Sequence, residues 1–294
     1  MSAFQLSPVD RAAQITREQF HNDYLVAATP VVFRSFASQW EATQKWTLAY
    51  FQQYHGDIIV PLYSVAFANS GRSYMRPETQ MRLADYIDLI QSEPSQLRMF
   101  LFNILRHIPA LCDDFDYPDL DINFLKGFPF MFFGGETSVV DAHFDADLSH
   151  VFLTQFQGRK RVILFSPENS AYLYRHPLTV STNVDIGKPD LERYPLLRGL
   201  KGLECTLDAG DTLFIPSGYW HYVYYESAGF ALSLRAQPAS VVKRVQGVLN
   251  IGKLKILDHM IGRCLGSDRW YGYKESLAVA KANRLPPNTP VATS

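Results

Sequence analysis

The sequence predicts a mainly β protein whose core is a sandwich or barrel, preceded by an α/β lead-in and followed by helices. Three observations support this fold class. Helix and strand patterns alternate over residues 1–97, short apolar strands with no helical pattern between them fill residues 98–239, and helical spacing returns from residue 240. The chain has 294 residues, 47% of them hydrophobic, which is enough to bury a sizeable core.

The lead-in contains recognisable helix start and stop signals. Thr16 stands three residues before Gln19, the spacing of a capping box, and a strand is expected in the "PVVFRSF" that follows. In "WTLAYFQQYHGDIIVPLYSV" a helix is expected to stop at Gly56 before a second strand. "RLADYIDLIQSE" is apolar at helical spacing and is followed by Pro94. We expect this segment to pack on the core.

The core is predicted from strands that are closely spaced along the chain. Turn residues such as Gly, Pro, Asn and Asp separate them, with no room for crossover helices, and this favours a sandwich or barrel over a parallel sheet. The expected strands include "RMFLF", "FMFF", "HVFLTQF", "RVILF", "ECTLDAGDTLFIP", "HYVYYE" and "FALSLRA".

The C-terminal segment, residues 240–285, is predicted to be helical, and residues 286–294 to be a flexible tail. Its apolar stripe is a possible homodimer surface. The segment has more Lys and Arg than Asp and Glu, and we interpret these residues as the solvent-facing side of the helices. The alternative is that they bind an acidic partner. The acidic stretch "CDDFDYPDLD" at 112–121 is expected to be an exposed loop, although it could also steer a basic peptide.

Composition argues against several classes of protein. The formal net charge is −1, which gives no general attraction to nucleic acid or anionic membranes. No apolar run approaches the ~20 residues of a membrane span, and the N-terminus does not resemble a secretory signal. The three cysteines have no metal-binding or disulfide spacing, so a reducing cytoplasm is expected; they are Cys112, Cys205 and Cys264.

The stretch "SVVDAHFDADLSH" places ionisable residues at every second position. If it is a strand, Asp141, His143, Asp145 and Asp147 share one face. A third candidate ligand is His221, which follows a Pro-Ser-Gly turn at the start of an aromatic strand. Two histidines and one carboxylate form the facial triad of non-haem Fe(II) oxygenases. On the residues alone, the alternative is that these are ordinary polar residues of strands.

The two segments that carry these residues resemble a known family. "FGGETSVVDAHFDADLSHVFLTQFQGRKRVILFSPE" and "LDAGDTLFIPSGYWHYV" are similar to the JmjC, cupin-like Fe(II) and 2-oxoglutarate dioxygenases, in the branch containing the asparaginyl hydroxylase that restrains the hypoxia-inducible factor. The resemblance implies a double-stranded β-helix, or jelly roll. It also implies that His143, Asp145 and His221 bind the iron; Asp147 in place of Asp145 is the alternative carboxylate.

Cosubstrate-binding residues follow from the same resemblance. Lys160 lies in line with two apolar residues of its strand, which would point it inward; on the residues alone, a hairpin lysine in solvent is an equal alternative. The resemblance implies that it points inward and pairs with a carboxylate of 2-oxoglutarate. Arg235 falls near the iron-chelating end of the cosubstrate, and Ser233, on the same strand face, is a second candidate for binding it; Arg235 could instead end its strand and pair with an Asp. Two positions depart from the family pattern, because Val140 and Phe100 stand where relatives often carry hydroxyl groups.

The expected function is therefore Fe(II)- and 2-oxoglutarate-dependent dioxygenation. The resemblance implies hydroxylation of a protein or peptide side chain with O2, and demethylation by the same chemistry is less favoured. The alternative is a catalytically idle, metal-binding cupin that acts as an interaction module. A zinc hydrolase on the same three residues ranks last, because no additional general base stands at a useful spacing.

Overall fold

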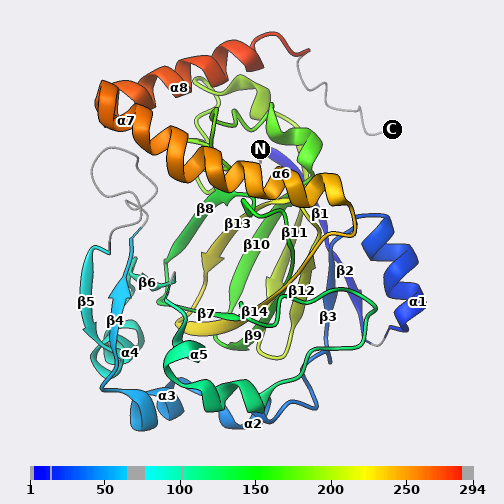
Figure 1. The fold of residues 1–294 in the computed structure, drawn as a ribbon, viewed down its shortest axis with the longest axis vertical. Coiled ribbons are helices and arrows are strands. Elements are labelled where there is room, and N and C mark those ends of the chain that lie inside the picture. The colour runs from blue at the N-terminus through cyan, green and yellow to red at the C-terminus, as the bar shows by residue number, and fades with distance from the viewer. Residues whose placement is uncertain (1–2, 14, 65–76, 101, 287–294) are drawn as a thin grey trace.

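Two facing β-sheets form the centre of the molecule (Figure 1). The computed structural model describes residues 3–13, 15–64, 77–100 and 102–286; the predicted tail beyond 286 lies outside them. One sheet has five strands in the order β1-β11-β10-β13-β8, and the other has seven in the order β2-β3-β12-β9-β14-β7-β6. The core strands are β7 (Phe130–Gly134), β8 (Val139–His143), β9 (His150–Gln157), β10 (Lys160–Phe165), β11 (Leu200–Leu207), β12 (Thr212–Ile215), β13 (Trp220–Tyr225) and β14 (Gly229–Ala236).

The chain passes repeatedly between these two sheets, and this connectivity makes a jelly roll. β7, β9, β12 and β14 belong to the seven-stranded sheet, and β8, β10, β11 and β13 to the five-stranded sheet. The double-stranded β-helix implied by the sequence is thereby confirmed. Because β8 and β13 are neighbours, residues almost 80 positions apart in the sequence meet at one end of the sheets.

Successive side chains of β10 point alternately into the barrel and away from it. Val162 and Leu164 are completely buried in the apolar cluster between the sheets, and Lys160 lies on the same face. Arg161 points to the other side, where it pairs with Glu204 of β11 at 2.7 Å. The inward direction expected for Lys160 is thus what the strand adopts.

The N-terminal segment extends both sheets and covers one of them. β1 (Phe4–Pro8) runs parallel to β11, while β2 (Asp10–Ala12) and β3 (Val31–Phe33) continue the seven-stranded sheet beyond β12. Neither β1 nor β2 was expected from the sequence. At the opposite edge β6 (Arg98–Met99) pairs with β7. β4 (Ile59–Leu62) and β5 (Thr79–Arg82) pair antiparallel in a separate two-stranded sheet.

The helix signals of the lead-in are confirmed. Thr16 and Gln19 form the capping box of α1 (Arg17–Gln19), which continues as the π-helical turn η1 (Phe20–Val26). Gly56 ends α3 (Leu48–His55), and α4 (Leu83–Ser92) buries four apolar residues at helical spacing. The other helices of this half are α2 (Glu41–Lys45), α5 (Ile104–His107) and the 3-10 turn η3 (Pro109–Asp114).

Aromatic packing holds the lead-in helices on the outer face of the seven-stranded sheet. Phe51 of α3 makes edge-on contacts with Phe133 and Phe230, both at 5.3 Å between ring centroids. Phe133 and Phe230 in turn stack on each other across β7 and β14. Buried aromatic pairs of this kind add to the stabilisation that burial gives.

The C-terminal segment is helical, as predicted, and lies across one end of the two sheets (Figure 1). Buried Asp258 connects its parts, accepting hydrogen bonds from Trp270 Nε1 at 2.9 Å and Lys274 Nζ at 2.8 Å. No helix within the described residues is long and apolar enough to cross a bilayer. The elements are α6 (Val241–Gly252), the π-helical turn η6 (Lys253–Asp258), α7 (His259–Leu265) and α8 (Ser267–Ala282).

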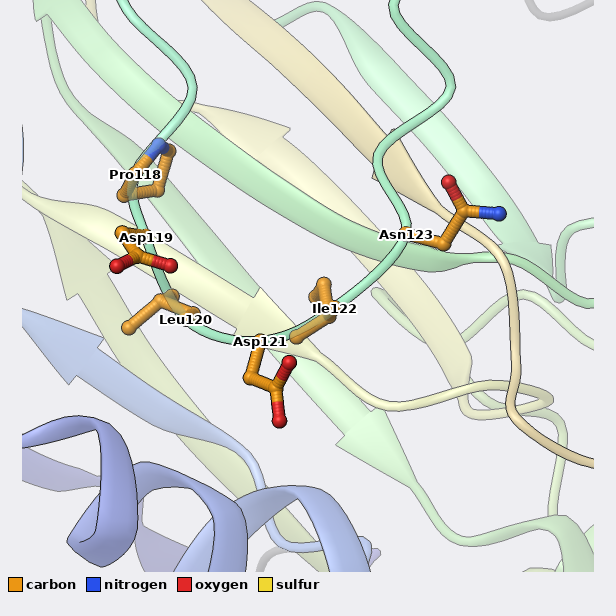
Figure 2. Close-up of a pocket in the computed structure, with 6 residues that line it drawn as sticks. All are labelled: Pro118, Asp119, Leu120, Asp121, Ile122 and Asn123. Carbon is orange, nitrogen blue, oxygen red and sulfur yellow. The ribbon is translucent and has the colours of Figure 1, made fainter.

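The acidic stretch at 112–121 is only partly the exposed loop that the sequence suggested. Asp114 is buried, where its carboxylate accepts hydrogen bonds from Lys45 Nζ and Trp46 Nε1, both at 2.7 Å. Such pairing offsets the cost of burying a charge. Further along, Asp119 pairs with Arg17. The end of this loop lines an open depression of about 440 Å³, which contains none of the candidate metal ligands. Figure 2 shows the residues that line it.

Candidate metal centre

His143, Asp145 and His221 come together at one end of the barrel. One donor atom from each lies within 4.8 Å of the other two, and within the described residues no other group of His, Cys, Asp or Glu side chains has this property. His143 on β8 is paired directly with His221 on β13, and their ring centroids are 4.3 Å apart. All three side chains are partly exposed.

A β-bulge, and not simple alternation, points His143 into the barrel. His221 pairs with His143 but Val223 pairs with Val140, so three residues of β8 span two of β13. Val140 consequently contacts the interior cluster, whereas Ala142 is buried in the cluster on the outer face. The interpretation of Asp141 to Asp147 as one strand face was therefore wrong.

The candidate carboxylate lies beyond the end of the strand. β8 ends at His143, and Asp145 and Asp147 belong to the turn that leads into β9. The Leu148 amide donates to the Asp145 carbonyl at 3.0 Å, and Leu148 adopts a positive φ of 54°. The turn curls back and so places the carboxylate of Asp145 beside the two imidazoles.

Hydrogen bonds fix which nitrogen each histidine offers. His143 Nδ1 donates to the Asp141 carbonyl at 2.8 Å, and His221 Nδ1 donates to the Tyr219 carbonyl at 3.3 Å. A carbonyl can only accept, so the Nδ1 atoms carry the protons and each Nε2 keeps its lone pair. This arrangement is typical of metal-binding histidines.

The charge states of the three groups suit a divalent cation. Burial, together with the charge of His221, lowers the pKa of His143 to about 4, and burial also lowers the pKa of His221. Burial alone would raise the pKa of Asp145, but the charge of Arg235 holds it at about 2. At neutral pH the site presents two neutral imidazoles and one carboxylate, the donor set that fits Fe(II) in a facial triad.

Arg235 of β14 is connected to this site through carboxylates. Its Nη2 donates to Asp145 Oδ1 at 2.7 Å, while its Nη1 donates to Asp147 Oδ1 at 3.1 Å and to Ser149 Oγ at 3.0 Å. The structure thus has the Asp pairing that the sequence left open as the alternative to cosubstrate binding. The pairing positions Asp145 and holds Asp147 away from the two histidines.

Lys160 is buried inside the barrel, with 1% of its surface exposed. Its Nζ lies 4.3 Å from the ring centroid of Tyr225, the residue paired with it on β13. No carboxylate of the described residues forms an ion pair with it, and burial followed by the charge of Arg98 lowers its pKa to about 7. Ser233 is also fully buried, and its Oγ has no hydrogen-bond partner among the described residues.

One buried cation was missed by the sequence analysis. Arg98 of β6 is 4% exposed although it carries a guanidinium group. The signal was available, because Arg98 stands in the apolar run "LRMFLF", where the argument applied to Lys160 applies equally.

Helix α6 supports the turn that carries Asp145 and Asp147. A Cβ atom at Gly247 would lie 2.3 Å from the carbonyl oxygen of Asp147, a backbone atom that cannot rotate away. We expect Gly247→Ala to lower the free energy of unfolding by about 1–3 kcal/mol through overpacking, as measured by urea denaturation.

Gly252 of the same helix provides the matched control. A Cβ there meets no described atom within 4 Å outside the helix itself, so Gly252→Ala should raise stability by about 0.5–1 kcal/mol. Equal stabilisation by both substitutions would contradict the close contact between α6 and this turn.

The chain is similar in sequence to a domain family and to several known proteins. A cupin-like domain family matches residues 17–241. The chain is 28% identical to tRNA wybutosine-synthesizing protein 5 of Gallus gallus, over 92% of this chain and 83% of that protein. It is 29% identical to Jumonji C domain-containing protein 5 of Drosophila melanogaster, over 74% and 56%. It is 27% identical to lysine-specific demethylase 8 of Xenopus tropicalis, over 74% and 50%.

Proposed function

Because this chain belongs to the JmjC/cupin-like family of oxygenases, we propose that it is a dioxygenase dependent on Fe(II) and 2-oxoglutarate. The observation that carries the proposal is the convergence of His143, Asp145 and His221 within 4.8 Å. Three protein donors on one side of a metal leave positions open for a chelating cosubstrate and O2.

The metal and cosubstrate would supply the redox chemistry, in which 2-oxoglutarate, O2 and a substrate C–H group give succinate, CO2 and a hydroxylated product. The side chains of this protein bind and orient. His143 and His221 present Nε2, and Asp145 presents the carboxylate oxygen that Arg235 does not occupy. Lys160 would pair with the distal carboxylate of the cosubstrate, and Val162 and Leu164 would exclude water beside it.

A protein or peptide side chain is the substrate we propose. The relatives carry names that point to tRNA modification and to lysine demethylation. A net charge of −1 favours a protein over tRNA, because nucleic-acid affinity depends on lysine and arginine neutralising phosphates.

A cytoplasmic location is also part of the proposal. It is supported by the three free cysteines, which agree with a reducing compartment.

A homodimer through α6 and α7 also remains a proposal. Its support is a set of exposed apolar side chains on these helices, and sedimentation equilibrium would measure the mass directly. The set includes Val241, Val245, Val248, Leu249, Met260 and Leu265.

Anaerobic titration with Fe(II), followed by 2-oxoglutarate, tests the proposed function. We expect a visible charge-transfer band once both are bound, and succinate release after oxygen is admitted. Iron binding without the band or succinate would favour the catalytically idle cupin. Substrate class is tested separately, by looking for the mass of one added oxygen atom on candidate peptides and on tRNA.

A further inference from the structure

Arg98 is a buried cation with no role in the chemistry proposed above. Its Nε atom is buried and has no hydrogen-bond partner among the described residues, and its guanidinium carbon lies 5.0 Å from the ring centroid of Phe100. Burial lowers the pKa of Arg98, and the charge of nearby Asp141, which forms no ion pair with it, offsets this only in part. Burying a cation without a directly paired anion is costly, so such a group is expected to have a ligand.

Strand register places Arg98 on the inner face of its sheet. It pairs with Gly134 of β7, and directly paired residues of antiparallel strands share a face. A Cβ at Gly134 would lie 2.5 Å from Tyr225 Cε1, so this face is turned toward β13 across the barrel. β6 lies at the edge of the sheet beside β7 in Figure 1.

Lys160 approaches the same tyrosine from the opposite sheet. It pairs with Tyr225 in the ladder between β10 and β13, and its Nζ lies over the Tyr225 ring. Arg98 and Lys160 therefore converge on Tyr225 from two sides, and the positive charge of Arg98 helps to lower the pKa of Lys160. Two like charges in one buried space repel each other unless an anion lies between them.

We propose that Arg98 and Lys160 together bind the distal carboxylate of the 2-oxoglutarate cosubstrate, an inference that rests on the proposed function. A guanidinium donates two parallel hydrogen bonds to a carboxylate, whereas an ammonium acts as a compact point charge, so the two groups are complementary. Val140 and Phe100 carry no hydroxyl group, and Arg98 supplies the donors that such groups would otherwise provide.

The test measures binding without turnover. Protein loaded with Mn(II) is titrated with 2-oxoglutarate under argon in a calorimeter, for the wild type, Arg98→Met and Arg98→Lys. We expect Arg98→Met to weaken 2-oxoglutarate binding about 10- to 100-fold, because hydrogen bonds to a charged group are lost. Arg98→Lys should recover part of the affinity, and the affinity for Mn(II) should stay unchanged in both variants.

Arg106 is the matched control, since its guanidinium also lies over a phenylalanine ring, Phe128, but outside the barrel and exposed. Arg106→Met should bind 2-oxoglutarate like the wild type. A purely structural role for Arg98 would lower the melting temperature and leave cosubstrate affinity unchanged, and that result would overturn the inference.

Three outcomes can be distinguished. If Arg98→Met does not fold, Arg98→Lys decides alone: reduced affinity supports the inference and unchanged affinity refutes it. If the Mn(II)-loaded wild type binds no 2-oxoglutarate, the proposed function itself fails. If the wild type binds it and the Arg98 variants bind it equally well, only the role of Arg98 fails.

Discussion

Asp145→Ala should lower succinate production by more than about 100-fold while the protein remains folded. Asp145 contributes the only negative charge among the three candidate ligands. Its removal leaves two neutral imidazoles and frees Nη2 of Arg235, which now lies 2.7 Å from Asp145 Oδ1. The site would then repel a divalent cation. The measurements are metal content after dialysis, succinate release, and circular dichroism to confirm the fold.

Asp147→Ala is the control for this prediction, because Asp147 is the alternative carboxylate ligand from the sequence. Asp147 bonds to Arg235 and to the amide and hydroxyl of Ser149, and is not part of the donor group. Its removal should reduce turnover by about 10- to 100-fold at most, through looser positioning of Arg235. A larger loss for Asp147→Ala than for Asp145→Ala would reverse the assignment.

Lys160→Met should raise the dissociation constant for 2-oxoglutarate by about 100-fold or more, since a buried charge partner is removed. The same substitution should make the free protein more stable. Methionine fills a similar volume without placing an ammonium group in an apolar interior that provides no described carboxylate. Affinity and stability thus move in opposite directions, which a general packing defect would not produce. Calorimetry and thermal melting measure the two effects.

The pH dependence of this variant is a second readout. In the folded protein the pKa of Lys160 is about 7, against an ordinary 10.5, so between pH 7 and 10.5 the unfolded chain holds the extra proton. The contribution of Lys160 to the free energy of unfolding of the wild type therefore increases with pH across that window. Ligand binding runs the other way, because the bound carboxylate needs the ammonium form: affinity should fall about tenfold per pH unit above pH 7.

The groups that face Lys160 do not titrate in that range. Burial raises the pKa of Tyr225 to about 12, and Arg98 stays protonated. Lys160→Met should therefore show affinity that is flat from pH 7 to 9. Lys201→Met, on the exposed side of neighbouring β11, should behave like the wild type. Unchanged affinity in Lys160→Met would refute a role for Lys160 in cosubstrate binding.

The features that depend on near neighbours in the chain could be predicted from the sequence. The capping box of Thr16 and Gln19 and the buried face of α4 follow from spacings of three and four residues. The inward direction of Lys160 follows from alternation with Val162 and Leu164. The residue types at positions 143, 145 and 221 made a metal site one of two interpretations, and the resemblance to a known family implied that these three are the ligands.

How those residues are held depends on contacts between elements that are far apart in the chain. The bulge in β8 depends on its pairing with β13, and Asp145 reaches the histidines from a turn instead of a strand. Arg235 meets Asp145 across 90 residues of sequence, and Arg98 faces Lys160 only because β6 and β10 lie on opposite sheets. The periodicity of apolar residues indicates on which face of its own helix or strand a residue lies. It does not record which distant element lies opposite, since strand order and register are set by the packing of the whole chain.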